Sequence, residues 1–170
     1  MYASSLGSHL GEAWNLLSRV SRVTRGVDGL RDVLAQQTII GNDVDLIWAL
    51  LPLVKLREFA SGAELIRQGD SSNSIYFLLI GSVSIGINGR MVAARSAGDH
   101  MGEMAMVDPA VARTATVVAT SACVLAEVSE PEIVAVAQAF PILWRRIAIV
   151  LSRRLREHER FDFRGFRSHD

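Results

Sequence analysis

Apolar residues in the first part of the chain recur at helical spacing. Between residues 16 and 34 they follow one another in steps of four and three, at Leu16, Val20, Val23, Val27, Leu30 and Leu34. This stripe predicts an amphipathic helix that packs against another helix or against a second copy of the chain. Because Gly26 and Gly29 each weaken a helix by about 1 kcal/mol relative to alanine, we expect it to break into two.

The next helical segment is shorter. A helix through Leu51 is expected, because Asn42 or Asp43 can cap its start and Pro52 ends it. Short β-favouring segments separated by Gly, Ser, Asn or Asp follow at residues 54–59, 64–67, 75–80, 83–87, 114–119 and 123–128. Residues 82–87 alternate small or polar with apolar side chains, as in a half-buried strand, and Asn88-Gly89 predicts a tight hairpin turn.

Helical signals return after the strands. Ser129 and Glu132 have the spacing of a capping box, and Pro141 can open a second helix with a broad apolar face opposite its arginines. The order is helices, strands and helices, without the alternation of strand and helix that signals a parallel sheet. The sequence therefore predicts an α+β fold, an antiparallel β-roll (double-stranded β-helix or jelly roll) flanked by amino-terminal and carboxyl-terminal helices.

The composition is that of one globular domain without net charge. Of 170 residues, 49% are apolar and 21% are charged. Zero net charge argues against nonspecific nucleic-acid binding by this chain alone, although residues 141–170 hold eight arginines against four carboxylates. The longest apolar run, residues 46–54, is too short for a membrane span, and the first residues do not resemble a secretory signal. We expect a cytoplasmic protein with no membrane contact of its own. Its 17 arginines against one lysine are typical of a GC-rich bacterial source.

No pattern in the sequence indicates catalysis or a metal. Cys123, the only cysteine, lies in an apolar run and is expected to be a small buried hydrophobe. The histidines show no metal-ligand spacing, and no nucleophile motif accompanies the serines. We therefore expect a non-enzyme without metal or cofactor, and we expect His100 to be exposed in a loop.

Residues 98–116 contain the residue types of an anion site. A glycine followed by a short apolar turn can present the free backbone amides of Gly102, Glu103 and Met104 to a phosphate. Arg113, ten residues beyond Glu103, adds a permanently charged fork that can hold two phosphate oxygens. Because Glu103 would repel an anion unless it accepts from a donor on the ligand, it indicates a hydroxyl such as the ribose 2′-hydroxyl of a 3′,5′-cyclic nucleotide.

The same residues resemble the phosphate-binding cassette of the cyclic-nucleotide-binding domain family. The cassette motifs are Gly-Glu-Met-Ala-Met at 102–106 and Arg-Thr-Ala-Thr at 113–116, and the resemblance extends upstream to Gln-Gly-Asp at 68–70 and to residues 76–83. It covers about residues 43–160. One departure is Met101, which stands where the family commonly has an aromatic residue.

The resemblance implies roles for individual residues. The cassette residues expected to bind the ligand are Gly102, Glu103, Met104, Ala105, Arg113, Thr114 and Ala115. Glu103 would bind the ribose hydroxyl and Arg113 the phosphate, while backbone at Gly102, Met104 and Ala115 completes the cradle and Thr114 contacts phosphate or base. The final helix covers the base in the family, a role that would fall near Arg153, Arg154, Leu155 or His158.

The resulting interpretation is a regulatory sensor that binds a cyclic nucleotide and transmits binding through movement of its carboxyl-terminal helix. The base stays open among adenine, guanine and pyrimidines, that is cAMP, cGMP, cCMP or cUMP. Alternatives are a ligand-independent interaction scaffold, or the sensor half of an antiviral effector that responds to cCMP or cUMP. Retention of both Glu103 and Arg113 favours a ligand-binding domain over a scaffold.

The expected organisation has three parts. Residues 1–41 form a helical extension, residues 42–160 the cyclic-nucleotide-binding domain with lid helices at 129–160, and residues 161–170 a tail or linker. The tail is too short for a winged helix, so the effector domain that we expect would lie outside this sequence. A homodimer would use the amino-terminal or carboxyl-terminal helices.

Overall fold

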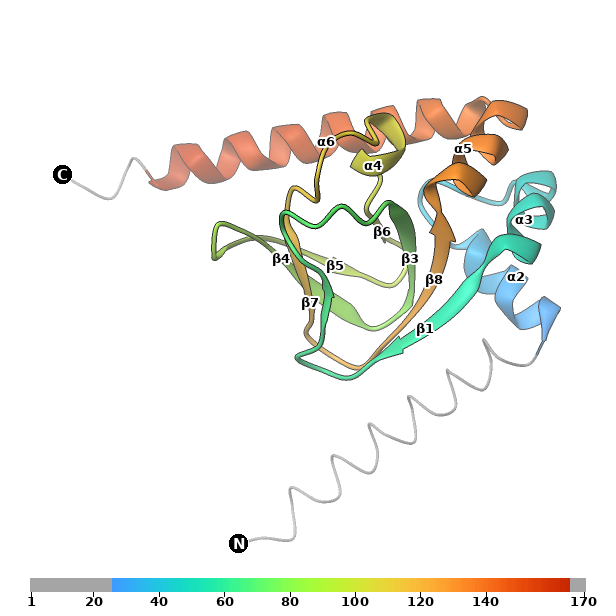
Figure 1. Cartoon of the computed structure of the whole chain (residues 1–170), viewed down its shortest axis with the longest axis horizontal. Helices are drawn as coiled ribbons and strands as arrows, with labels where there is room; N and C mark the ends of the chain where they lie inside the picture. Colours follow the sequence, from blue (N-terminus) through green and yellow to red (C-terminus); the bar gives the residue numbers. More distant parts are fainter. Residues whose placement is uncertain (1–25, 166–170) are drawn as a thin grey trace, which may run out of the picture.

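A computed structural model describes residues 26–165, apart from the side chains of Ala105 and of residues 157–165 (Figure 1). The predicted stripe enters this region as α2 (Val27–Ala35), which starts after Gly26 with a φ of 86°. Gly26 stands at the N-cap of α2, and Gly29 is accommodated inside the helix. The stripe residues before 26 lie outside the described part.

The second helix follows the sequence prediction closely. In α3 (Val44–Leu50) the Asp43 side chain accepts a hydrogen bond from the backbone nitrogen of Leu46 at 3.2 Å, which caps the helix. Pro52 then falls in a 3₁₀ turn, η1 (Leu51–Leu53), that leads into the strands.

The described strands form two four-stranded antiparallel sheets, which is the β-roll that the sequence predicted. The first sheet has the order β1 (Lys55–Phe59), β8 (Cys123–Ser129), β3 (Ser74–Ile80) and β6 (His100–Met101). The second has the order β2 (Glu64–Ile66), β7 (Thr116–Ala119), β4 (Ser82–Ile87) and β5 (Arg90–Ser96). The hairpin between β4 and β5 turns at Asn88 and Gly89, both with positive φ.

Alternation along the strands separates two apolar clusters. The inner one fills the space between the sheets and consists of Ile66, Leu78, Val83, Met101, Val117, Ala119, Cys123 and Leu125. Cys123 is 2% exposed, which confirms it as a buried hydrophobe. The outer cluster packs the other face of β3 and β8, including Phe77 and Val128, against the helices. A large fully buried side chain such as Phe77 contributes about 2 to 3 kcal/mol of hydrophobic free energy.

Two carboxyl-terminal helices complete the outer cluster. In α5 (Glu130–Ala139), Ser129 and Glu132 form the predicted capping box. The last helix, α6 (Ile142–Gly165), continues past residue 160, where the sequence interpretation placed a tail. It crosses the top of the roll, and the short α4 (Met104–Val107) overlaps it in Figure 1. Within the described residues, no single helix combines the length and hydropathy needed to cross a membrane.

A connector of residues 36–43 joins α2 to α3 and contacts two distant parts of the chain. Thr38 donates from both its backbone nitrogen and its Oγ1 to the carbonyl oxygen of Gly98, each at 2.9 Å. On its other side, Arg146 of α6 donates to the carbonyl oxygens of Ile39 and Ile40 and lies 3.7 Å from the Asp43 carboxylate. The connector therefore holds the first residue of the predicted cassette and the start of α6.

Candidate functional site

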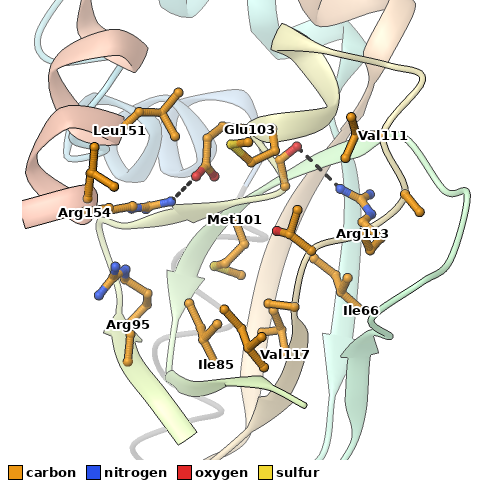
Figure 2. A pocket seen from close by; sticks show the side chains of 18 residues that line it. Ile66, Ile85, Arg95, Met101, Glu103, Val111, Arg113, Val117, Leu151 and Arg154 are labelled. Atoms are coloured by element: carbon orange, nitrogen blue, oxygen red, sulfur yellow. Dashed lines mark hydrogen bonds and ion pairs between the residues drawn. The ribbon is translucent and has the colours of Figure 1, made fainter. Parts of the chain in front are cut away.

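A cavity of about 480 Å³ lies between the second sheet, the loop from Gly102 to Ala115 and α6. Its apolar wall includes Ile66, Ile85, Val117 and Leu151. Hydrogen-bonding side chains enter from different elements: Arg95, Glu103, Arg113, Thr114 and Arg154 (Figure 2). A concave apolar site with a few convergent polar groups has the character of a small-molecule binding pocket.

Arg113 is buried at one end of this cavity. Its side chain leaves the loop before β7, and only 7% of the residue is exposed. The guanidinium donates to the Ser74 carbonyl at 2.7 Å, to Ser72 Oγ at 3.1 Å and to the Gly102 carbonyl at 3.4 Å. Burial lowers the pKa of Arg113, but a guanidinium stays charged in proteins. Among the described residues, no carboxylate lies within 4.0 Å of it.

Gly102 brings the loop backbone against Arg113. It has a φ of 87°, which side chains rarely allow, and a Cβ there would lie 2.6 Å from the Ser74 carbonyl and 2.7 Å from Arg113 Nη1. The sequence thus needs glycine at this position for both conformation and space. This close approach leaves the amide-bearing backbone at the cavity wall, next to the arginine.

Glu103 is buried as well, but it has a cationic partner. The residue is 5% exposed, and its Oε1 accepts from Arg154 Nη1 of α6 at 2.5 Å, the dashed line at the left of Figure 2. Arg154 Nη2 also donates to the His100 carbonyl at 2.7 Å. Although burial alone would raise the pKa of Glu103, the Arg154 charge holds it below its usual value. Glu103 is therefore an ionised acceptor inside the cavity.

His100 differs from its sequence prediction. We expected an exposed loop histidine, yet the residue is 1% exposed because β6 pairs with β3, with His100 opposite Phe77. Both of its ring nitrogens lack a hydrogen-bond partner among the described residues. Burial lowers the pKa of His100 to about 4, so the ring is neutral at pH 7.

Most of the predicted cassette residues line the cavity. These are Gly102, Glu103, Met104, Arg113, Thr114 and Ala115. The side chain of Ala105 lies outside the described part. The sequence analysis did not single out Arg95 of β5 or Leu151 of α6, both of which line it. Arg95 lies in a strand that the apolar pattern did not predict, and Leu151 was counted only in the apolar face of its helix.

The residues of the last helix that were expected to cover the base lie on different faces of α6. Arg154 and Leu155 line the cavity, whereas Arg153 is exposed and does not. The exclusion of Arg153 follows from the helical turn, which points adjacent residues in different directions. The side chain of His158 lies outside the described part.

The arrangement can bind a small molecule that carries both an anion and a hydroxyl donor. A buried cation without a carboxylate partner favours the anion, and an ionised carboxylate favours the donor. Within the described residues, no group of three or more His, Cys, Asp or Glu side chains has the geometry to hold a metal ion.

Comparison with known proteins identifies the family. The model of the cyclic nucleotide-binding domain matches residues 56–140. The chain belongs to this family. As a cyclic nucleotide-binding domain it is a sensor fold, and its ligand is a cyclic nucleotide.

Relatives of this cyclic nucleotide-binding domain include effector proteins and regulators. The Pycsar effector protein XpPycTIR of Xanthomonas perforans is 39% identical over 78% of this chain and 45% of the relative. The Pycsar effector protein PaPycTIR of Pseudomonas aeruginosa is 35% identical over 78% of this chain and 42% of the relative. The catabolite activator protein of Thermus thermophilus is similar in structure, with a TM-score of 0.61 and 28% identity over 74% of this chain and 60% of that one. This chain spans less than half the length of the two effectors.

Proposed function

We propose that Arg113 binds the phosphate of the cyclic nucleotide and that Glu103 accepts from its ribose 2′-hydroxyl. The observation that carries this proposal is the state of Arg113, a 7% exposed cation whose partners are neutral oxygens. A buried charge is costly unless an opposite charge approaches it. A cyclic phosphate supplies one negative charge, and the guanidinium fork can hold two of its oxygens.

Glu103 couples the ligand to α6 in this proposal. One of its oxygens already accepts from Arg154. A 2′-hydroxyl that binds Glu103 therefore either shares the carboxylate with Arg154 or displaces Arg154, and displacement would release this contact between Glu103 and α6. A ligand shifts a conformational equilibrium only by binding its two states with different affinity, and this shared carboxylate provides such a difference. We propose that the resulting movement of α6 is the output of the domain.

The relatives support a narrower proposal for the whole protein. Because Pycsar effectors are about twice as long as the segment that this chain matches, we propose that the chain is the sensor part of such an effector. In that case a separate domain, and not this one, carries the effector activity. Of the bases left open by the sequence, we propose a pyrimidine, so that the ligand is cyclic CMP or cyclic UMP.

The test is a calorimetric panel of cyclic CMP, UMP, AMP and GMP against the parent and three variants, Arg113→Ala, Glu103→Ala and a control. Arg113→Ala should weaken binding more than tenfold, because a charge-assisted contact with phosphate contributes more than about 1.5 kcal/mol. The matched control is Arg31→Ala, which removes an arginine of α2 whose side chain is 41% exposed and whose salt bridges lie on the surface. Its affinity should equal that of the parent.

Each result of the panel has a separate meaning. Binding of all four ligands with equal affinity would contradict the pyrimidine proposal but not the site. Parent-like affinity in Arg113→Ala would contradict the role of Arg113. The 2′-deoxy form of the tightest ligand tests Glu103, because the parent should discriminate against it and Glu103→Ala should not.

A further inference from the structure

Behind Arg113 lies a carboxylate that the sequence motifs do not include. Glu127 of β8 stands directly opposite Tyr76 of β3 in the antiparallel pair. Its Oε1 accepts from the Ser74 hydroxyl at 2.8 Å and from the Tyr76 hydroxyl at 3.4 Å, while its Oε2 accepts from Arg57 of β1 at 2.7 Å. One carboxylate thus connects three strands of the first sheet.

Two of these partners also support the Arg113 guanidinium. The backbone carbonyl of Ser74 accepts from Arg113 Nη2 at 2.7 Å, and the Tyr76 ring centroid lies 6.0 Å from Arg113 Cζ. Ser74 and Tyr76 are two residues apart on one strand and therefore project to the same face. A guanidinium at this distance from an aromatic face is attracted by the ring.

Glu127 accepts hydrogen bonds from the hydroxyl groups of both of these residues. Although burial favours its protonated form, the hydrogen bonds from Arg57 and Ser74 hold the pKa of Glu127 below its usual value. It is therefore an ionised acceptor at neutral pH, and charge-assisted hydrogen bonds of this kind are stronger than neutral ones. Its charge also favours the charged form of Arg113, with which it makes no direct contact.

We propose that Glu127 is a positioning residue for the anion site: through Ser74 and Tyr76 it holds the Arg113 guanidinium in the orientation that receives the phosphate. This inference rests on the proposed role of Arg113. It predicts that loss of Glu127 weakens ligand binding without removing any group that touches the ligand.

The first experiment is a double-mutant cycle by calorimetry, with the panel ligand that binds the parent most tightly. Glu127→Ala should weaken binding about fivefold, the effect of one lost positioning hydrogen bond. In an Arg113→Ala background it should change affinity less than twofold, because residues that act through one another are not additive. Glu127→Gln keeps an acceptor oxygen, so its affinity should lie between those of the parent and Glu127→Ala. It replaces Glu127→Ala in the cycle if the alanine variant does not fold.

The matched control is Glu64→Ala. Glu64 is also a strand carboxylate with an arginine at 2.7 Å, but its partner is Arg67 and it supports neither Ser74 nor Tyr76. Its removal should leave affinity unchanged. An equal loss in Glu64→Ala and Glu127→Ala, or a full fivefold loss in the Arg113→Ala background, would overturn the proposal.

The second experiment needs no ligand, so that it separates this inference from the proposed function. Arg113 Nε donates to Ser72 Oγ at 3.1 Å, and its ¹⁵N signal can be assigned because Arg113→Ala lacks it. Glu127→Ala should shift or broaden that signal, and Glu64→Ala should not. A signal that Glu127→Ala leaves in place would refute the positioning role, even if the parent binds no nucleotide in the panel.

Discussion

The ion pair between Glu103 and Arg154 gives a quantitative test of the site. The substitution Arg154→Met keeps the length of the side chain and removes its charge. It leaves a carboxylate that is 5% exposed without its cation. Breaking a buried pair on one side costs about 3 to 5 kcal/mol. Because Arg154 retains 14% side-chain exposure and water can reach the pair from that side, we expect about 3 kcal/mol of lost stability at pH 7.

Removal of both charges should cost much less. In the variant with Glu103→Gln and Arg154→Met no buried charge stays unpaired, and the remaining loss is the hydrogen bond from Arg154 Nη2 to the His100 carbonyl. That bond contributes about 1 kcal/mol. The expected difference of about 2 kcal/mol between the single Arg154 variant and the double variant is the signature of a buried pair.

Urea denaturation, followed by circular dichroism, measures these values. Arg153→Met is the matched control, because Arg153 is the exposed neighbour on the same helix and should change stability by less than about 0.5 kcal/mol. Without Arg154, burial raises the pKa of Glu103, so its protonation relieves the unpaired charge and the cost of Arg154→Met should shrink from pH 7 to pH 5. Equal losses in the two methionine variants at both pH values would refute the reasoning.

Three further predictions concern other residues of the site. His100 has a pKa of about 4 in the fold against 6.5 when exposed, so the unfolded chain binds more protons than the folded chain between these pH values. The free energy of unfolding should therefore fall by on the order of 3 kcal/mol as pH decreases from 6.5 to 4. Urea denaturation of His100→Asn should lack this pH-dependent loss. Gly102→Ala should reduce both stability and nucleotide affinity, because its Cβ would clash with Ser74 and Arg113. Gly81→Ala should reduce stability alone, because its Cβ would clash with Ala122 and Cys123, which do not line the cavity. Thermal melting measures the stability of both variants, and calorimetry measures their affinity. Hydrogen exchange with saturating ligand should change protection across residues 145–160 as well as 102–115, and a change confined to the latter would exclude α6 as the switch.

The strands that the sequence predicted are those with a strong local signal. The apolar residues of β3 are continuous, those of β8 run from Cys123 to Val128 with Glu127 as the single interruption, and β4 alternates with a period of two. By contrast, β5 contains two arginines and two alanines, and only its hydrogen bonds with β4 make it a strand. The two residues of β6 carry no periodicity at all. Their pairing with β3 is also the reason why His100 is buried, which the local pattern could not indicate.

The sequence motif located the candidate site but not the ion pair inside it. Glu103 and Arg113 were predicted from residue type and spacing, and the structure places both at one cavity. The ion pair of Glu103 joins residues 51 positions apart, so it depends on where α6 crosses the roll. The predicted strand also began too early: β7 starts at Thr116 and not at residue 114, and the Arg113 backbone ahead of it bonds to Gly69 and Asp70.

The connector between α2 and α3 has a mechanical consequence. Its residue Thr38 is hydrogen-bonded to Gly98, where the predicted cassette begins, and its neighbours Ile39 and Ile40 are hydrogen-bonded to Arg146 near the start of α6. A displacement of either the loop or α6 would therefore be transmitted to the backbone of residues 38–40. A force on α2 would reach the cavity by this route and would act on the loop and on α6 together.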